Sequence, residues 1–289
     1  MQRLAYSIIS WLPFPILYVC ARIAYVFVYY VARYRRAVVK DNLRQAFPEK
    51  SDAELAALGK KFYRRLTEVA FEIVRARRMT PADFRQRVTI RNPELVHTYS
   101  KDLNRSVIVL TIHQGNWEWM LHGATTALEI PIDPVYKTLH NPVANKLIHE
   151  IRSQFGSRPL AMAQATRDIL KRRSEFRLFV MVADQAPTRH ERSYWTTFLN
   201  QESAFFMGAE SIAKLTRFPV LFAQCHRMRT GHYEIEFHEV AEPPYEKESH
   251  EIIERYVEIA QQCIRAEPES WLWSNRRWKR NRHNDDAEA

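Results

Sequence analysis

Short apolar runs alternate with helical patterns along residues 87–240, and this alternation constrains the fold more than any other feature of the sequence. Residues 106–112, SVIVLTI, are apolar almost throughout, as expected of a strand buried on both faces of a sheet. The alternation predicts an α/β fold, with a mainly parallel sheet flanked by helices. At 219–240 two strand patterns meet across the turn RTG, which predicts an antiparallel hairpin at one end of that sheet.

Local patterns place the individual elements. Residues 51–78 have the apolar spacing of an amphipathic helix, and Ser51 with Glu54 has the pattern of a capping box at its start. The polar residues 184–204 are expected to form a loop. The other strands are expected at 87–91, 132–137, 157–162 and 176–183, and the other helices from a turn near 115 to about 128 and at 142–155, 164–173, 208–216 and 248–266.

The amino terminus is strongly apolar. Residues 4–32 contain a single charged residue and are followed by the basic segment RYRRAVVK at 33–40. A cleaved signal peptide would carry its positive charge mainly before the apolar run. After two prolines, residues 16–32 would form a helix about 26 Å long, which is marginal for spanning a bilayer. We interpret this segment as a retained anchor that lies in or dips into the membrane, with its basic flank on the cytoplasmic side; a buried core helix is the alternative.

Composition excludes several classes of protein. With only 6 glycines, the chain has no glycine-rich nucleotide-binding loop. Its three cysteines are far apart and odd in number, which excludes a disulfide framework and indicates a reducing compartment. A net charge of +10 favours polyanionic partners: nucleic acid, anionic lipid or an acidic carrier protein. No helix-turn-helix, zinc finger or RNP pattern is present, so we do not expect nucleic acid as a partner.

The segment TIHQGNWEW, at 111–119, places His113 and Glu118 five positions apart. On one continuous helix their side chains would point about 140° apart. Gly115 allows the chain to reverse after the strand, and Asn116 can cap a new helix. Glu118 would then lie in the first helical turn, and we expect it to form a hydrogen bond with His113.

This spacing is not specific by itself. The chain has 11 histidines and 33 acidic residues, and His97/Asp102 and His283/Glu288 show the same separation. Only His113 follows a buried strand, and in parallel sheets ligands bind beyond the carboxyl ends of the strands. A second strand, at 176–183, ends in Asp184-Gln185. A purely structural His–Glu pair at the helix start is the alternative to a catalytic one.

Several motifs together resemble one family. They are HQGNWEW, an internal LPFP, VYKTLHNPVANKL, VADQAP, FFMGAESIAKLTRFPV and ESWLWSNRRWK. In this order they resemble the membrane-bound lipid A late acyltransferases (the lauroyl and myristoyl transferases), which belong to the lysophospholipid acyltransferase superfamily. The resemblance extends over residues 4–280.

The resemblance implies acyl transfer from acyl carrier protein, or from a coenzyme A thioester, to a hydroxyl of a membrane glycolipid such as a lipid A precursor. It places the protein on the cytoplasmic face of the bacterial inner membrane, against an anionic surface. His113 and Glu118 match the family's His-x4-acid dyad, and Asp184 matches the acid of its Asp-Gln motif. Lys137 lies where a basic residue is expected to meet an acceptor phosphate.

The expected mechanism uses His113 as general base and Glu118 as the residue that orients it. Backbone N–H groups near Gly115-Asn116 are candidate donors to the oxyanion. We expect no metal or cofactor. The residues expected to bind substrate are Gln114, Asn116, Lys137, Arg152, Asp184 and Gln185.

One departure from the family leaves the acceptor open. The residues after the Asp-Gln motif lack the glycine-containing loop that usually precedes FFG in lipid A enzymes. A lysophospholipid, mannoside or aryl-polyene-type lipid is therefore an alternative acceptor, and a non-catalytic basic membrane adaptor is an alternative function. We expect an anchor at 1–36, an α/β acyltransferase domain at 37–280 and a frayed polar tail at 281–289.

Overall fold

The core of the protein is a seven-stranded sheet. The computed structural model describes residues 2–138, 140–280 and 282, so the predicted frayed tail lies outside the described residues except for Arg282. The sheet order is β1-β9-β8-β2-β5-β3-β4. All neighbours are parallel except β8 and β9, so the predicted α/β fold is confirmed. The strands are β1 (Val88–Ile90), β2 (Val107–Thr111), β3 (Ile132–Tyr136), β4 (Leu160–Ala161), β5 (Leu178–Val182), β8 (Val220–Arg229) and β9 (His232–Ala241).

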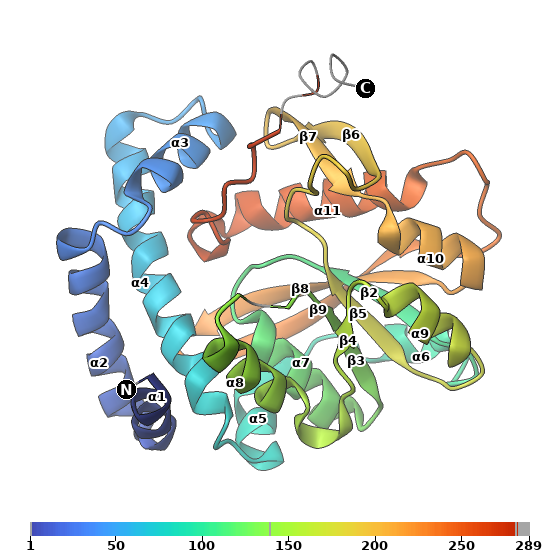
Figure 1. The fold of residues 1–289 in the computed structure, drawn as a ribbon, viewed down its shortest axis with the longest axis horizontal. Helices are drawn as coiled ribbons and strands as arrows, with labels where there is room; N and C mark the ends of the chain where they lie inside the picture. The colour runs from blue at the N-terminus through green and yellow to red at the C-terminus, as the bar shows by residue number, and fades with distance from the viewer. Residues whose placement is uncertain (1, 139, 281, 283–289) are drawn as a thin grey trace.

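Helices cover both faces of this sheet (Figure 1). Successive residues of β2 point to opposite faces: Val107 and Val109 belong to one apolar core and Ile108 to the other. The first core is completed by α5 (Pro81–Arg87), α6 (Glu94–Ser100), α7 (Trp117–Leu128) and α8 (Pro142–Arg152), and the second by α9 (Ala165–Lys171), α10 (Gly208–Thr216) and α11 (Glu251–Ala266). Burial on both faces explains why the central strands are continuously apolar.

The segment 184–204 is not the loop that its polarity predicts. It contains β6 (Ser193–Phe198) and continues into β7 (Gln201–Phe206), and the two form a separate antiparallel pair. Phe198 and Phe205 are buried and pack edge to face at a centroid distance of 5.3 Å. Phe198 also contacts Trp271, and Phe205 contacts Tyr256 of α11, so aromatic contacts that local polarity does not reveal join the pair to the body of the protein.

The amino-terminal helices lie beside the α/β body, at the left of Figure 1. They are α1 (Gln2–Trp11), α2 (Phe14–Val26), α3 (Arg36–Ala46) and α4 (Asp52–Ala76), and α2 continues into a π-helical segment, η1 (Phe27–Val31). The capping box of Ser51 and Glu54 at the start of α4 is confirmed.

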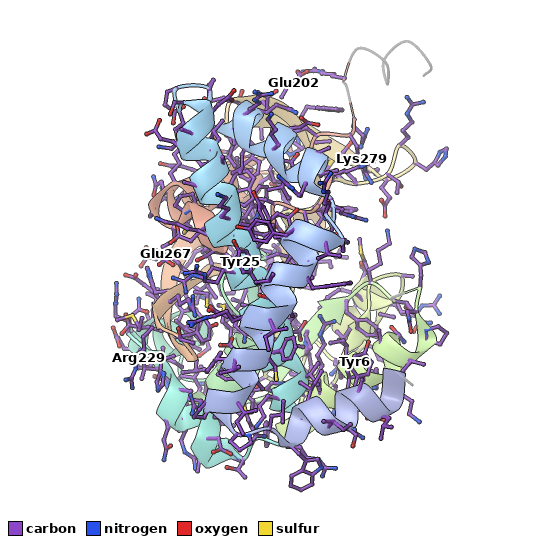
Figure 2. All side chains as sticks on the ribbon, turned by 90° about the vertical axis from the view of Figure 1, so that its left-hand side faces the viewer. Tyr6, Tyr25, Glu202, Arg229, Glu267 and Lys279 are labelled. Carbon is purple, nitrogen blue, oxygen red and sulfur yellow. The ribbon has the colours of Figure 1, made fainter. Side chains whose placement is uncertain are left out.

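The helix formed by α2 and η1 has a buried side and an apolar exposed side. Leu17, Ala21 and Tyr25 are buried, on the side packed on α4, whereas Val19 and Ile23 are exposed. Figure 2 shows Tyr25 where α2 meets α4. The 18 residues from Phe14 to Val31 are long and apolar enough to cross a membrane, and only 22% of them are buried. The alternative of a buried core helix is therefore wrong.

Candidate active site

Two polar side chains meet at the carboxyl ends of β2 and β5. These strands are parallel neighbours, and Thr111 lies opposite Val182. His113 and Asp184 each follow two residues later, so the register brings them side by side. His113 Nδ1 lies 2.6 Å from Asp184 Oδ1, and the His113 backbone N–H donates to Asp184 Oδ2 at 3.0 Å. The two residues form a doubly bonded pair.

Asp184 is held as a buried anion. Its side chain is 3% exposed, and Oδ2 also accepts a hydrogen bond from the indole Nε1–H of Trp271 at 2.7 Å. Burial is the largest influence on the pKa of Asp184 and would raise it, but the His113 ring and these hydrogen bonds together hold the pKa below its ordinary value. An ionised Asp184 keeps the proton of His113 on Nδ1. His113 Nε2 is then free to accept a proton, and it lies 3.4 Å from the side-chain amide of Gln185.

The turn after β2 depends on Gly115. This residue has φ +60°, and a Cβ at its position would lie 2.6 Å from Cys225 Sγ, so another residue would be both strained and in steric conflict. Asn116 then caps α7 by accepting a hydrogen bond from the Trp119 backbone N–H at 3.0 Å. The predicted turn and helix start are therefore present, and the Trp117 ring packs edge-on to His113 at 5.1 Å.

The predicted hydrogen bond between His113 and Glu118 is wrong. Glu118 instead forms a two-pronged ion pair with Arg152 of α8, in which Arg152 Nε lies 2.8 Å from Oε2. Burial opposes ionisation of Glu118, but the charge of Arg152 holds its pKa below the ordinary value. A permanently charged guanidinium is a stronger partner for a buried carboxylate than an imidazole whose Nδ1 is already bonded to Asp184.

An apolar cleft lies beside the His113–Asp184 pair, between the sheet and helices α7 and α8. It holds about 640 Å³ of empty space, part of it open to solvent. Thr111, Val182 and Trp117 line its end next to the pair, and the lining continues along the sheet through Val180, Leu178 and Ile132. Glu118 and Arg152 are its charged lining residues, and their pairing leaves the cleft with little net charge.

The family model of the bacterial lipid A biosynthesis acyltransferases matches residues 4–280 of the chain. The chain belongs to this family. It is thus an enzyme that transfers acyl groups, and a search of curated proteins found no match to it. Among the described residues of this acyltransferase, no group of three His, Cys, Asp or Glu side chains is arranged to hold a metal ion.

Several residues predicted to bind substrate have partners within the acyltransferase itself. The Gln114 side chain is buried and donates to the Cys263 carbonyl at 2.9 Å. Asn116 is also buried, with its oxygen engaged in the cap and its amide bonded to Glu72 at 2.9 Å. These two side chains therefore support the turn rather than face open space. Lys137 is exposed one residue beyond β3, at the same edge of the sheet as His113, and its predicted role stays a prediction.

The predicted oxyanion donors are also used within the acyltransferase. The backbone N–H of Gly115 donates to the Ser270 carbonyl at 3.0 Å, and the N–H of Asn116 bonds to the thiol of Cys225. The first backbone bond of α7 runs from the Met120 N–H to the Asn116 carbonyl. The N–H groups of Trp117 and Glu118 precede that bond and have no acceptor within the helix. These two N–H groups are therefore the ones still available as donors at the start of α7.

Trp271 is a neighbour of the His113–Asp184 pair that the sequence did not reveal. Its motif, with several tryptophans and arginines, suits either a membrane interface or the packing of one or two tryptophans in the core, and Trp271, Trp273 and Arg277 are all buried. Trp271 bonds to a carboxylate 87 residues away in the chain, and no local pattern encodes that contact. The pairing of His113 with Asp184, in contrast, had a signal, because both residues follow the ends of apolar strands.

Glu72 of α4 is a second residue that the sequence did not reveal. It is fully buried, and its carboxylate accepts hydrogen bonds from Tyr233 at 2.6 Å, Asn116 at 2.9 Å and Tyr18 at 2.9 Å. Burial raises the pKa of Glu72 to about 7, against the lowering effect of these hydrogen bonds. Since Tyr18 belongs to α2 and Asn116 to the turn after His113, Glu72 connects the apolar amino-terminal helix to that turn.

Proposed function

We propose that this acyltransferase moves a fatty acyl chain from an acyl carrier protein thioester to a hydroxyl of a membrane glycolipid such as a lipid A precursor. His113 is the general base, and Asp184, rather than Glu118, holds it. The observation that carries the proposal is the bonded pair of His113 and Asp184, at the carboxyl ends of neighbouring strands and beside an apolar cleft.

The chemistry follows from the weakness of a hydroxyl as a nucleophile. His113 Nε2 removes the proton of the acceptor hydroxyl as its oxygen attacks the thioester carbonyl. The buried charge of Asp184 stabilises the imidazolium that forms. When the tetrahedral intermediate collapses, the C–S bond breaks and the departing thiolate takes the proton from His113 Nε2. The products are an ester and a free thiol.

Negative charge develops on the carbonyl oxygen during attack. We place the oxyanion at the start of α7, where the backbone N–H groups of Trp117 and Glu118 are available and the helix dipole favours an anion. In this arrangement the base and the oxyanion donors come from one chain reversal, the turn at Gly115.

The apolar cleft is the proposed site of the acyl chain, because its lining side chains, which belong to the sheet, α7 and α8, are almost all hydrocarbon apart from Glu118 and Arg152. The ion pair of Glu118 with Arg152 neutralises the two charges that the cleft would otherwise present to a hydrocarbon chain. Glu118 is thus proposed to shape the cleft, and Arg152 acts as its counter-ion rather than as a ligand for an acceptor phosphate.

We place the enzyme on the cytoplasmic face of the bacterial inner membrane, with residues 1–36 as its anchor. Support comes from the exposed apolar side of α2 and η1 and from the basic residues that follow it. An acyl carrier protein can reach the catalytic edge from the cytosol while the acceptor lipid stays in the bilayer.

The test uses the full chain in detergent with radiolabelled acyl carrier protein thioester and a lipid A precursor. His113→Ala should abolish labelling of the glycolipid. His97→Ala is the matched control, because His97 has the same spacing to an acid but is exposed; it should retain wild-type activity. Substantial transfer by a folded His113→Ala protein would exclude His113 as the base. Transfer only to a lysophospholipid or another lipid would refute the acceptor.

A further inference from the structure

A second hollow lies at the end of the apolar amino-terminal helix, away from the His113 cleft. It is a groove between η1, α3 and α4, with about 1,040 Å³ of empty space, part of it open to solvent. It shares no lining residue with the cleft beside His113. We call it the α3–α4 groove.

The rim of the α3–α4 groove is basic. Arg33, Arg36 and Lys40 line it, and all three are exposed. The rim has one acid, Asp52, and this carboxylate is already held by Arg44 through contacts of 2.8 and 2.9 Å. The rim therefore carries an excess of positive charge, because Asp52 is the one acid among its lining residues and is already paired with Arg44.

The floor of the groove is apolar and pre-formed. Val39, Leu43 and Leu55 are buried beneath it. Tyr29 and Tyr63 form one wall, with their rings 5.2 Å apart. The Arg36 guanidinium lies 4.5 Å from the centre of the Tyr29 ring, which positions this charge at the rim. A basic rim above a hydrocarbon floor is complementary to an amphiphile with an anionic head.

The position of the groove indicates where such an amphiphile comes from. Tyr29 belongs to η1, and the neighbouring Phe27, Tyr30 and Val31 are exposed on the apolar surface of that helix. Arg33 follows directly. With α2 and η1 in a bilayer, as the proposed function places them, the groove opens at the level of the lipid headgroups, where basic side chains meet phosphate.

We propose that the α3–α4 groove binds an anionic phospholipid of the surrounding bilayer, with its phosphate at Arg33, Arg36 and Lys40 and part of an acyl chain on the apolar floor. This is a lipid site separate from the site of reaction. It would hold the enzyme at a defined depth and orientation, since α3 and α4 join the membrane helix to the catalytic body.

Gly59 offers a way to fill the groove without removing charge. It lies in α4 on the groove, and a Cβ there would meet only Leu43 Cδ1, at an ordinary 3.8 Å. Gly59→Leu should therefore occupy the space of the lipid chain, and leucine favours a helix more than glycine does. A second variant, Arg33→Gln/Arg36→Gln/Lys40→Gln, removes the charge and leaves the floor unchanged.

The experiment measures lipid retention by the detergent-purified full chain in native mass spectrometry, with phosphatidylglycerol, phosphatidylcholine, inorganic phosphate and a lipid A precursor as probes. We expect wild type to retain phosphatidylglycerol in preference to the other three. Both variants should weaken that binding about tenfold or more. The control Lys60→Gln/Lys61→Gln/Arg64→Gln removes the same charge from the exposed side of α4 and should bind as wild type does.

Three results would overturn the proposal. Equal retention of phosphatidylcholine, or of free phosphate, would show that the groove does not select an anionic lipid. If folded Gly59→Leu bound phosphatidylglycerol as well as wild type does, surface charge alone, and not the groove, would account for the binding. Tighter retention of the lipid A precursor would make the groove part of the acceptor site. Because binding is read without turnover, these results are independent of whether His113→Ala abolishes transfer.

Discussion

Replacing Asp184 by asparagine tests the His113–Asp184 pair, because it replaces one of the two acceptor oxygens of the carboxylate with an NH2 group. Asp184 Oδ2 accepts two hydrogen bonds, from the His113 backbone N–H at 3.0 Å and from Trp271 Nε1–H at 2.7 Å, while Oδ1 faces His113 Nδ1 at 2.6 Å. Asparagine has one acceptor oxygen and one NH2 group in place of these two oxygens. The oxygen should take the place of Oδ2, because the opposite orientation directs the NH2 group at two N–H donors.

This orientation reverses the histidine tautomer. The amide of the introduced asparagine would donate to His113 Nδ1, so the ring proton would move to Nε2, the atom that has to accept the proton of the substrate. The opposite orientation leaves two buried donors unpaired, at about 1–3 kcal/mol each. We therefore expect kcat to fall by about 10³ to 10⁴, equivalent to roughly 4–5.5 kcal/mol in the barrier. KM should change little, because Asp184 is buried and does not line the cleft.

The assay measures kcat and KM with detergent-solubilised acceptor, together with nitrogen-15 NMR of the His113 ring to identify its tautomer. Asp102→Asn is the control, because it makes the same substitution at an exposed acid. It should leave kcat and KM unchanged. A folded Asp184→Asn enzyme with kcat within tenfold of wild type, or with Nδ1 still protonated, would refute the reasoning.

Three further predictions concern buried charge and the acyl donor. Glu118→Gln should lower the free energy of unfolding by about 3 kcal/mol, because it leaves the charge of Arg152 without its counter-ion; chemical denaturation that finds equal stability would contradict the ion-pair role. The folded protein retains the proton of Glu72 up to its raised pKa of about 7, against an ordinary 4.5. Stability should therefore fall by about 3 kcal/mol as pH rises from 4.5 to 7 and then level off, whereas Glu72→Gln should lack this component in parallel melts. If acyl carrier protein is the donor, the rate at subsaturating donor should fall as salt shortens the Debye length from about 30 to 8 Å, and charge reversal of the exposed Lys60, Lys61 and Arg64 should raise the donor KM without changing kcat. A salt-independent rate, with coenzyme A thioester used equally well, would exclude the carrier protein.

Two basic segments of the chain, 60–78 and 276–282, could dock an acidic carrier protein. In the second, Arg277 is buried and donates to the Ala204 carbonyl at 2.8 Å. Reversing its charge would disturb the core. The exposed Lys60, Lys61 and Arg64 of α4 are therefore the better test of docking.

Local sequence determined most of the helices and strands and the place of His113 at a strand end. The spacing of apolar side chains over short segments was sufficient to predict the parallel strands, the hairpin of β8 and β9 and the exposed apolar helix at the amino terminus. Ser51 and Asn116 cap their helices as predicted, because a cap depends on residues two or three positions away. The place of His113 at a strand end followed from the apolar run before it.

Tertiary structure alone decided what His113 pairs with. Glu118 is near in sequence, but the start of α7 directs it to Arg152. Asp184 is 71 residues away, and only the pairing of β2 with β5, Thr111 opposite Val182, brings it into contact. Strand order depends on how all the helices and strands pack together, and no short segment contains that information. The same holds for Trp271, Glu72 and the β6–β7 pair, whose partners are set by burial against distant parts of the chain.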